Sequence, residues 1–299
     1  KMLKGLKIFW ALAVFAFAVL GAAAAWLCRL ALLRRDGWRL PCVCVFFVVL
    51  LGYLLGGGVN AAIFRTRRQR VTLGLAQPLR IALLSDLHLG FFTTRGMLRR
   101  AVRAVNRENV DLVLIAGDFF DMDLDSLRHK EECRALLRSL SGRYGVYGCL
   151  GNHDFYLLDA RKDEFLRSSG VTVLLDEAVK IGELTVFGRR DQTDPARQPW
   201  QTLRPGDGEK LLVLDHNPAA WRDYIGSAGL LLCGHTHGGQ FSLLEEPIGL
   251  TVDIEERYRT GWLTENRIPI LISNGVGTSV IPYRLFCPPQ IHQIDLHSN

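Results

Sequence analysis

The stretch that decides the fold is Ile81-Ala-Leu-Leu-Ser-Asp86-Leu-His88, an apolar run that stops at an aspartate and a histidine. Four later apolar runs end in the same way, and each passes directly to residue types that bind metal ions. They lead into Gly117-Asp118, Gly151-Asn-His-Asp154, Asp215-His216 and Gly234-His-Thr-His237. Because ligands of open α/β sheets gather at the carboxyl ends of the strands, five such endings predict one common site.

The residue types at these endings indicate which metals the site prefers. Asp and His ligands with an Asn amide oxygen suit Mn²⁺, Fe or Zn²⁺, and the absence of Cys at the endings argues against a structural zinc site. In Asp86-x-His88 and His235-x-His237, side chains two positions apart on an extended backbone point to the same side. Each pair is therefore expected to approach one metal or two adjacent metals. The glycines at 117, 151 and 234 are expected to let the backbone turn sharply beside them.

Taken singly, each of these residues has a simpler explanation. A strand-end Asp is commonly a turn or cap residue, and a lone His is more often structural than catalytic. The set is different, since five of the eight histidines fall in the strand-end segments: His88, His153, His216, His235 and His237. The other three, His129, His292 and His297, are interpreted as surface residues.

From residue 80 onward, short apolar runs alternate with amphipathic stretches, which predicts an α/β domain with buried sheets. The spacing predicts helices over 97–106, 127–140, 161–169 and 218–225. The predicted strands are 80–85, 111–116, 145–150, 171–175, 184–187, 211–214, 229–233, 269–273 and 291–296. Residues 192–208, rich in Pro, Gln and Asp, are expected to form a long loop.

The charge distribution argues against a nucleic-acid substrate. The formal net charge is +6, but 11 of the 36 Lys and Arg and only one of the 30 acidic residues precede residue 80. The remainder carries 25 basic against 29 acidic residues and is mildly acidic, the opposite of a polyanion-binding groove. The seven cysteines contain no C-x-x-C pair, so neither a disulfide framework nor a zinc ribbon is indicated.

Two long uncharged runs precede the domain and predict a transmembrane helical hairpin. No residue from 8 to 28 or from 40 to 64 is charged, and each run as a helix is long enough to cross a bilayer core. A signal peptide is the alternative, but its apolar core is normally ~7–15 residues and no second span follows it. We therefore divide the chain into a hairpin with a basic juxtamembrane segment, residues 1–70, and a catalytic domain, residues 80–299.

Basic residues flank both runs and give the expected orientation. Three lysines precede the first run and four arginines between 65 and 70 follow the second, against four arginines in the connecting loop. The positive-inside rule then places both ends, and the catalytic domain, in the cytoplasm of a multi-pass inner (plasma) membrane protein. Gly56-Gly57-Gly58 and the basic stretch at 65–70 predict that the second helix frays into an interfacial segment, where the arginines would lie on anionic headgroups.

Taken together, these motifs resemble those of a known family. The order D-x-H, G-D-x-x-D, G-N-H-D, a single downstream His and G-H-x-H resembles the calcineurin-like metallophosphoesterase superfamily over nearly all of residues 80–299. The ending Asn274-Gly-Val-Gly-Thr-Ser with Pro282-Tyr-Arg-Leu-Phe-Cys-Pro-Pro resembles its membrane-associated bacterial branch. The resemblance implies a two-sheet sandwich flanked by helices, holding two divalent metal ions, with Mn²⁺ favoured over Fe and Zn²⁺.

The resemblance also implies a role for each site residue. One metal would be held by Asp86, His88 and His237, the other by Asn152, His216 and His235, with Asp118 bridging both. His153 would lie beside the leaving group, Asp154 would orient it, and Asp121 would support the loop.

The substrate is expected to be a phosphoester or pyrophosphate in a lipid, because an anchored site meets lipids by lateral diffusion. Some members of the resembled branch cleave UDP-2,3-diacylglucosamine, a lipid A precursor, to UMP and a lipid monophosphate.

Leu87, Leu89, Phe91 and Phe92 would shape an apolar entrance or pack within their loop. Arg95, Arg189 and Arg190 are candidates for a second phosphate or are solvated surface arginines. The alternatives are hydrolysis of another phospholipid or a soluble diester, and a scaffold that binds a partner through the same fold. No protein partner is expected.

Overall fold

The computed structural model describes most of the chain from residue 63 onward. The described residues are 63–90, 93, 95–155, 160–203, 206, 209–239, 242–243, 246–247, 254–279, 283–284 and 287–298, with eight single positions between 26 and 61. The chain divides into two compact units, Lys1–Gly56 and Gly57–Asn299, and the strands and helices below belong to the second.

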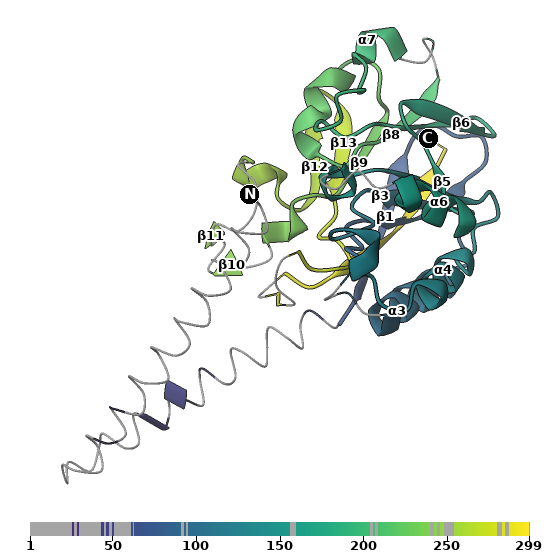
Figure 1. Ribbon diagram of the computed structural model, residues 1–299. Coiled ribbons are helices and arrows are strands. Elements are labelled where there is room, and N and C mark those ends of the chain that lie inside the picture. Colours follow the sequence, from purple (N-terminus) through teal and green to yellow (C-terminus); the bar gives the residue numbers. More distant parts are fainter. Residues whose placement is uncertain are drawn as a thin grey trace. The chain divides into compact units, whose positions relative to one another are not determined.

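Two six-stranded sheets form the centre of this unit (Figure 1). The first sheet has the order β1-β14-β2-β3-β4-β5 and the second β12-β13-β9-β8-β7-β6. The first comprises β1 Arg65–Thr72, β2 Leu79–Leu84, β3 Leu112–Ala116, β4 Val146–Cys149, β5 Thr172–Val173 and β14 Gln290–His297. The second comprises β6 Glu177–Ile181, β7 Leu184–Gly188, β8 Lys210–Leu214, β9 Leu230–Cys233, β12 Gly261–Glu265 and β13 Ile268–Ile272. A small antiparallel pair joins β10 Ser242–Leu243 to β11 Glu246–Pro247.

The middle strands of both sheets run parallel, which brings their carboxyl ends to one edge. In the first sheet β2, β3, β4 and β5 are parallel neighbours, and in the second β7, β8, β9 and β13 are. Strands β14, β6 and β12 pair antiparallel with their neighbours β2, β7 and β13. All five strand-end motifs predicted from the sequence follow a parallel strand, so the topology gathers them at one end of the sandwich.

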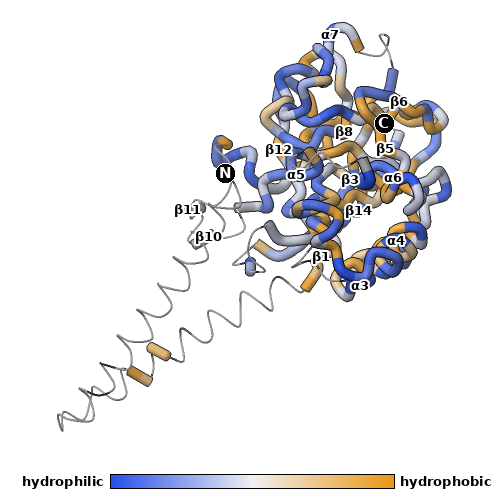
Figure 2. Tube along the Cα trace, viewed as in Figure 1, coloured by the Kyte–Doolittle hydropathy of each residue, from blue (hydrophilic) through white to orange (hydrophobic). Residues whose placement is uncertain are grey.

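Apolar side chains fill three layers. Between the sheets lie side chains of β2, β3, β7, β8, β9 and β14, such as Leu83, Leu114 and Leu212, all fully buried. The helices α3 Arg95–Asn106, α4 Lys130–Arg138 and α6 Ala160–Ser168 cover the other face of the first sheet. In Figure 2, α3 and α4 alternate between orange and blue, as expected for helices that bury one face.

The outer face of the second sheet is covered by short helical turns. They are the helix α7 Trp200–Leu203 and the 3-10 turns η2 Pro218–Tyr224 and η4 Glu256–Tyr258, with Trp221 and Tyr258 in the core. The remaining short elements are α5 Asn152–Phe155, η1 Leu124–Ser126 and η3 His237–Gly239. These layers make the α/β two-sheet sandwich flanked by helices that the sequence predicted.

The folded domain begins earlier than expected. We placed its start near residue 80 and interpreted 65–70 as an interfacial segment, but Arg65–Thr72 is strand β1. It pairs in parallel with β14 over its whole length, from Arg65 opposite Gln290 to Thr72 opposite His297. The prediction was wrong because an edge strand can expose a row of arginines to solvent, and such a strand lacks the apolar alternation that identifies inner strands.

Other differences concern elements with little apolar surface. Strands β6 and β12 were not predicted, since both are edge strands with mostly exposed or half-buried residues. The segment predicted as a helix at 218–225 is the 3-10 turn η2, which Pro218 begins. The loop at 192–208 contains the single turn α7. His292, interpreted as a surface residue, lies on β14 with 1% of its side chain exposed.

The predicted transmembrane hairpin lies almost entirely outside the described residues, so it stays a prediction. Within the described part of the chain, no helix has the length and apolar character needed to cross a bilayer.

Candidate metal centre

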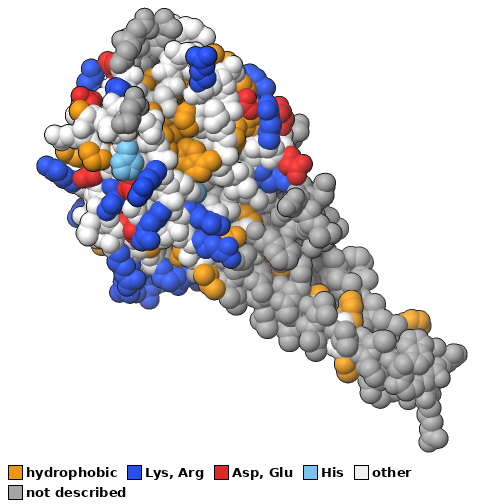
Figure 3. All heavy atoms as spheres, turned by 180° about the vertical axis from the view of Figure 1, so that it is seen from behind, with side chains coloured by type: hydrophobic (Ala, Val, Ile, Leu, Met, Phe, Trp, Pro, Cys, Tyr) orange, Lys and Arg blue, Asp and Glu red, His pale blue; other side chains and the backbone are white. Residues whose placement is uncertain are grey.

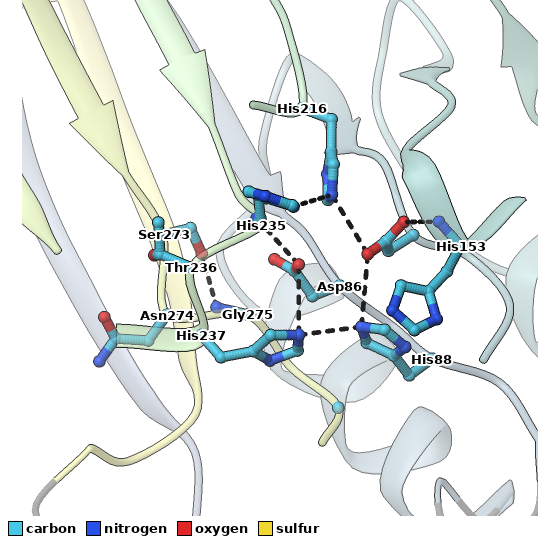
Figure 4. A network of polar contacts seen from close by, with 12 residues as sticks. Asp86, His88, His153, His216, His235, Thr236, His237, Ser273, Asn274 and Gly275 are labelled. Carbon is cyan, nitrogen blue, oxygen red and sulfur yellow. Dashed lines mark hydrogen bonds and ion pairs between the residues drawn. The ribbon is translucent and has the colours of Figure 1, made fainter. Parts of the chain in front are cut away.

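The predicted ligands come from five strand ends and meet at one edge of the sandwich. Asp86 and His88 follow β2, Asp118 follows β3, Asn152 begins α5 after β4, His216 follows β8, and His235 and His237 follow β9. Figure 4 shows Asp86, His88, His216, His235 and His237 turned toward one another. All are buried, although none belongs to an apolar core.

The first cluster joins Asp86, His88 and His237. The Nε2 atoms of His88 and His237 lie 2.9 Å apart, and His237 Nε2 lies 3.6 Å from Asp86 Oδ1. The opposite nitrogen of His88, Nδ1, lies 3.3 Å from the Asp121 carboxylate. A carboxylate on the outer nitrogen of a histidine fixes the ring so that the inner nitrogen offers its lone pair. Asp121 therefore positions His88.

The second cluster joins Asp118, His216 and His235 and includes Asn152. His216 Nε2 lies 3.1 Å from both Asp118 Oδ2 and Asn152 Oδ1. His235 Nδ1 lies 2.9 Å from the same Asn152 oxygen and 3.2 Å from His216 Nε2. Asp118 Oδ2 also lies 3.5 Å from His88 Nε2 of the first cluster. Asp118 thus stands between the clusters, as the resemblance implied.

The backbone at these positions is held in an uncommon conformation. Asp86, His88, Asp118, His235 and His237 all have positive φ, between 44° and 74°. Non-glycine residues rarely adopt this left-handed region, and such strain concentrates at functional sites. Its effect here is to turn each chain sharply at the end of its strand, so that the side chain projects over the edge of the sheet.

The glycines beside the ligands act mainly through the space they leave. Only Gly117 of the three has positive φ, so the expectation that all three permit sharp turns was too broad. A Cβ on Gly234 would lie 2.5 Å from Asp86 Oδ2, and a Cβ on Gly151 would collide with Asp118 Oδ1. These two positions require glycine because the carboxylates approach the backbone.

Neighbouring charges and burial shift the pKa values of the aspartate and histidines in the second cluster. Burial opposes ionisation of Asp118, but His216, His153 and His88 outweigh it and hold the pKa of Asp118 well below its usual range. Burial lowers and Asp118 raises the pKa of His216, and the carboxylate prevails, so that pKa lies well above its usual value. Burial and the neighbouring His216 lower the pKa of His235 to about 4. The buried Asp118 carboxylate is therefore stabilised by positive charge placed among the surrounding imidazoles.

This arrangement fits divalent metal ions. Two pairs of imidazole nitrogens face each other at 2.9 and 3.2 Å, where lone pairs would repel unless a cation or a proton lies between them. Asp86 Oδ2 and His235 Nε2 are buried without a hydrogen-bond partner among the described residues. A set of Asp, His and Asn oxygen and nitrogen donors without thiolates suits first-row divalent ions. The two clusters, joined through Asp118, make a binuclear site.

The ring of His153 lies beside that of His88 in the first cluster, as Figure 4 shows. Its ring centroid is 4.7 Å from that of His88, and its backbone N–H donates to Asp118 Oδ1 at 2.9 Å. Its Nδ1 lies 2.9 Å from the Asp121 carbonyl oxygen. Because a carbonyl only accepts, Nδ1 carries the proton and orients the imidazole. Burial lowers the pKa of His153.

Asp154 acts differently from the expectation that it would orient His153. Its carboxylate accepts hydrogen bonds from the backbone N–H groups of Phe119, Phe120 and Gly151 at 2.9–3.3 Å. These bonds join the turn after β3 to the turn after β4, and so fix the backbone that carries Asp118 and Asn152. Lys162 supports the same turn by donating to the carbonyl oxygens of His153 and Asp154.

Asp215, the acidic residue directly before His216, points away from the clusters. It is fully buried and pairs with Arg197 at 2.9 Å, and it accepts a hydrogen bond from the Tyr224 hydroxyl. The Arg197 guanidinium and the Tyr224 hydroxyl therefore hold the end of β8 on the side away from the clusters. The three charged and polar groups together satisfy one another in the interior.

Arg284 is a functional candidate that the sequence reasoning did not single out. This fully buried guanidinium donates to the backbone carbonyl oxygens of His237, Asn274 and Gly277, the Asn274 bond being 2.7 Å. It thereby ties the turn of His237 to the segment after β13. The only sequence signal is a charged residue inside an apolar, proline-bounded block, Pro282-Tyr-Arg-Leu-Phe-Cys-Pro-Pro.

Three arginines considered for a second phosphate have other partners. Arg189 is 1% exposed and pairs with Asp176 at 2.5 Å, and Arg190 pairs with Asp194 at 2.7 Å. Arg95 pairs with Glu132 on α4. The apolar entrance is likewise not formed by Leu87 and Leu89, which are buried in the core beneath the helices. Phe91 and Phe92 lie outside the described residues.

Comparison with known proteins decides the family. Residues 79–239, more than half of the chain, match the calcineurin-like phosphoesterase family. The chain belongs to this family. The match begins at the first residue of β2 and ends with the last residue of η3, so it contains all seven predicted ligands.

Relatives of this calcineurin-like phosphoesterase cover most of its length. An uncharacterized metallophosphoesterase of Aquifex aeolicus is 31% identical over 218 residues, which are 69% of this chain and 80% of that protein. The phosphodiesterase YaeI of Escherichia coli is 31% identical over 237 residues, 74% of this chain and 83% of that protein. A transmembrane protein with metallophosphoesterase domain of Danio rerio is 29% identical over 241 residues, 73% of this chain and 53% of that protein.

Family membership and the two clusters together define the activity class. The chain is a metal-dependent phosphoester hydrolase with a binuclear divalent metal site.

Proposed function

We propose that this hydrolase cleaves a phosphodiester or pyrophosphate bond in a lipid-linked substrate at the membrane surface. The first candidate is UDP-2,3-diacylglucosamine, cleaved to UMP and a lipid monophosphate, with Mn²⁺ in the site. The observation that carries the phosphoester chemistry is the convergence of both ligand clusters on Asp118. The lipid substrate is supported by the two uncharged runs before the domain, which would keep the chain in a plasma membrane with its site on the cytoplasmic side.

Diester or pyrophosphate cleavage is favoured over monoester cleavage by one comparison. The relative from Escherichia coli, which aligns with 74% of this chain, is named a phosphodiesterase. A soluble diester is the second candidate, because the same metal centre serves both and the substrate is chosen by the loops around it.

The residues of the site have separate roles in hydrolysis. Two divalent ions, when bound, neutralise phosphate oxygens and make a water acidic enough to serve as the nucleophile near pH 7. Asp118, held ionised by the surrounding imidazoles, keeps the two ligand clusters at a fixed separation. Asp86 and Asn152 add further oxygen ligands, and the backbone at Gly234 and Gly151 leaves room for the carboxylates of Asp86 and Asp118 respectively.

His153 is the proposed proton donor to the leaving oxygen. Its Nδ1 is committed to the Asp121 carbonyl, so transfer would take place at Nε2. Donation requires the imidazolium, which burial disfavours and the Asp118 charge favours. This residue should therefore matter for turnover and not for metal retention.

The test uses the full chain, purified in a neutral detergent, chelated and reloaded with Mn²⁺. UDP-2,3-diacylglucosamine, bis-p-nitrophenyl phosphate and p-nitrophenyl phosphate are offered separately, and products are identified by mass spectrometry. The variants are Asp118→Asn and, as a matched control, Asp125→Asn, whose carboxylate is largely exposed on η1.

We expect UMP and lipid monophosphate from the wild type and the Asp125 variant, and neither product from the Asp118 variant. Cleavage of the aryl diester without cleavage of the lipid would overturn the lipid A assignment and favour a soluble diester. Cleavage of the aryl monoester alone would contradict the diester proposal.

A further inference from the structure

The exposed face of α3 is entirely cationic. The helix buries Met97, Leu98, Ala101, Val102 and Val105 against the first sheet. Its exposed positions include five arginines and no acidic residue: Arg95, Arg99, Arg100, Arg103 and Arg107, the last directly after the helix. At about 100° per residue these arginines occupy an arc of roughly 140° opposite the apolar stripe.

Strand β1 extends this cationic face. Four arginines are exposed on this edge strand, and side chains alternate along it, so Arg68 and Arg70 lie on the α3 side of the first sheet and Arg65 and Arg67 on the other side. The two elements are joined, because Arg68 pairs with Glu108 after α3 and the Arg100 guanidinium lies 5.8 Å from the ring of Phe64 before β1. We call Arg68, Arg70 and the five arginines of the helix segment the α3–β1 face. Figure 3 shows blue side chains gathered at this lower end of the domain.

Most of this charge is not neutralised within the protein. Glu108 pairs with Arg68, and Glu132 pairs with Arg95 at 2.5 Å and lies 3.9 Å from Arg99. No described carboxylate forms an ion pair with the remaining arginines of the face: Arg70, Arg100, Arg103 and Arg107. A domain that is otherwise mildly acidic thus concentrates its positive charge on one side, which favours a large anionic partner.

The sequence around the face indicates which anionic partner it meets. Residue 65, the first of β1, directly follows the uncharged run 40–64, and Ile63 at the junction is 55% exposed. Basic residues next to an apolar segment are attracted to anionic phospholipid headgroups. We propose that the α3–β1 face docks on the anionic surface of a lipid bilayer.

This docking would also set the position of the catalytic edge. α3 begins shortly after Asp86-x-His88, so a bilayer held against the α3 arginines lies near the loop that leaves the metal centre. The proposal does not depend on the substrate, because the face contains none of the metal-centre residues. A nucleic acid is the competing anionic partner, and a bilayer is favoured over it because β1 directly follows the uncharged run 40–64.

The test measures arginine accessibility in the full chain embedded in lipid nanodiscs. Phenylglyoxal modifies exposed arginines, and mass spectrometry gives the rate for each peptide. Nanodiscs of phosphatidylcholine alone are compared with nanodiscs containing phosphatidylglycerol, at low salt and at 0.5 M NaCl. Arg222 and Arg257, 59% and 55% exposed and far from α3 in sequence, are internal controls.

We expect modification of Arg99, Arg100, Arg103 and Arg107 to slow by at least about threefold with phosphatidylglycerol at low salt, and to recover at high salt. The control arginines should not change. Equal rates in the two nanodiscs would overturn the proposal, as would stronger protection by a DNA duplex than by the anionic bilayer.

A charge-reversal variant provides the second measurement. Arg99→Glu with Arg103→Glu should abolish the lipid-dependent protection of the neighbouring arginines, while Arg222→Glu with Arg257→Glu should leave it intact. Hydrolysis of bis-p-nitrophenyl phosphate should be unchanged in both, which separates loss of docking from loss of the proposed catalytic function. Undiminished protection in the first variant would contradict docking through α3.

Discussion

At the scale of single residues, the site depends on carboxylates pressed against glycine backbone. Asp118 touches the position that a Cβ of Gly151 would occupy, and Asp86 does the same at Gly234. Both contacts leave the carboxylates buried and aimed at imidazoles, which is the condition for holding cations in a dry site. The positions of these two carboxylates therefore depend on glycines, which have no side chain.

Replacing Gly151 by Ala tests this dependence. The added methyl collides with Asp118 Oδ1, so the carboxylate must move from the point where the two clusters meet. We expect metal affinity and hydrolysis to fall by roughly 10–100-fold, the usual effect of disturbing a residue that positions a ligand. Metal content by mass spectrometry and bis-p-nitrophenyl phosphate hydrolysis are the measurements. Gly206→Ala, where a Cβ meets nothing within 4 Å, is the control and should be unaffected.

His292 provides a prediction about stability and pH. Its side chain is 1% exposed, and neither ring nitrogen has a hydrogen-bond partner among the described residues. Burial, with a smaller contribution from Arg67, lowers its pKa from 6.5 to about 4. The unfolded chain therefore binds a proton between these values that the folded chain does not. The free energy of unfolding should decrease as pH falls from about 6.5 to 4.

The measurement is urea unfolding of the full chain at pH 7.0, 5.5 and 4.5, followed by tryptophan fluorescence. A shift of this size corresponds to at most about 3 kcal/mol between the ends of the range. His292→Leu should flatten the pH dependence by that amount, while His129→Leu, at an exposed position, should not. An identical pH dependence in wild type and His292→Leu would show that this histidine is solvated.

At the scale of elements, buried ion pairs hold the second sheet behind the metal centre. Arg197 and Asp215 join the segment after β7 to the end of β8, and Arg189 and Asp176 join the end of β7 to the turn before β6. Buried pairs contribute little net stability when complete, but an isolated buried charge is costly. These pairs therefore fix geometry more than they stabilise the fold.

Removing one member of a buried ion pair tests how much the remaining unpaired charge destabilises the fold. Arg197→Met leaves Asp215 buried without its cation, and we expect a loss of about 3–5 kcal/mol in the free energy of unfolding. Adding Asp215→Asn should restore part of it, because the unpaired charge is then gone. Chemical unfolding of the single, double and control Arg222→Met variants is the measurement. A single variant as stable as the control would mean that water reaches Asp215.

The elements also show how far the sequence predicts this fold. Inner strands such as β3 and β8 were found because burial on both faces makes them continuous apolar runs. The edge strands β1, β6 and β12 were missed, since one exposed side and a polar composition leave no such run. The ligands were predictable because each follows an inner strand directly.

The residues that support the metal ligands were harder to predict from the sequence than the ligands themselves. Arg284 reaches His237 and Lys162 reaches His153 across gaps in sequence that no local pattern records. Asp154 was recognised, but its contacts with the turn after β3 depend on how two strand ends lie in space. His292 was placed on the surface because a histidine on an edge-proximal strand carries no burial signal.

At the scale of the whole molecule, charge and apolar character are segregated along the chain. The uncharged runs and most of the excess positive charge lie before residue 80, and α3 adds its arginines to the same side of the domain as β1. The catalytic edge, in contrast, is lined by Asp and His. This segregation is what a hydrolase needs if its body is held by an anionic surface while its site receives a phosphoester.

Two ligand clusters that meet at Asp118 would hold two metal ions, and metal counting together with activity tests this most directly. The full chain is stripped with a chelator, reloaded with Mn²⁺, and assayed for metal by inductively coupled plasma mass spectrometry and for bis-p-nitrophenyl phosphate hydrolysis. We predict two equivalents and restored hydrolysis for the wild type, and for Asp118→Asn fewer than two equivalents without restored hydrolysis. A stripped chain that holds no metal and still hydrolyses the diester at the full rate would contradict the account.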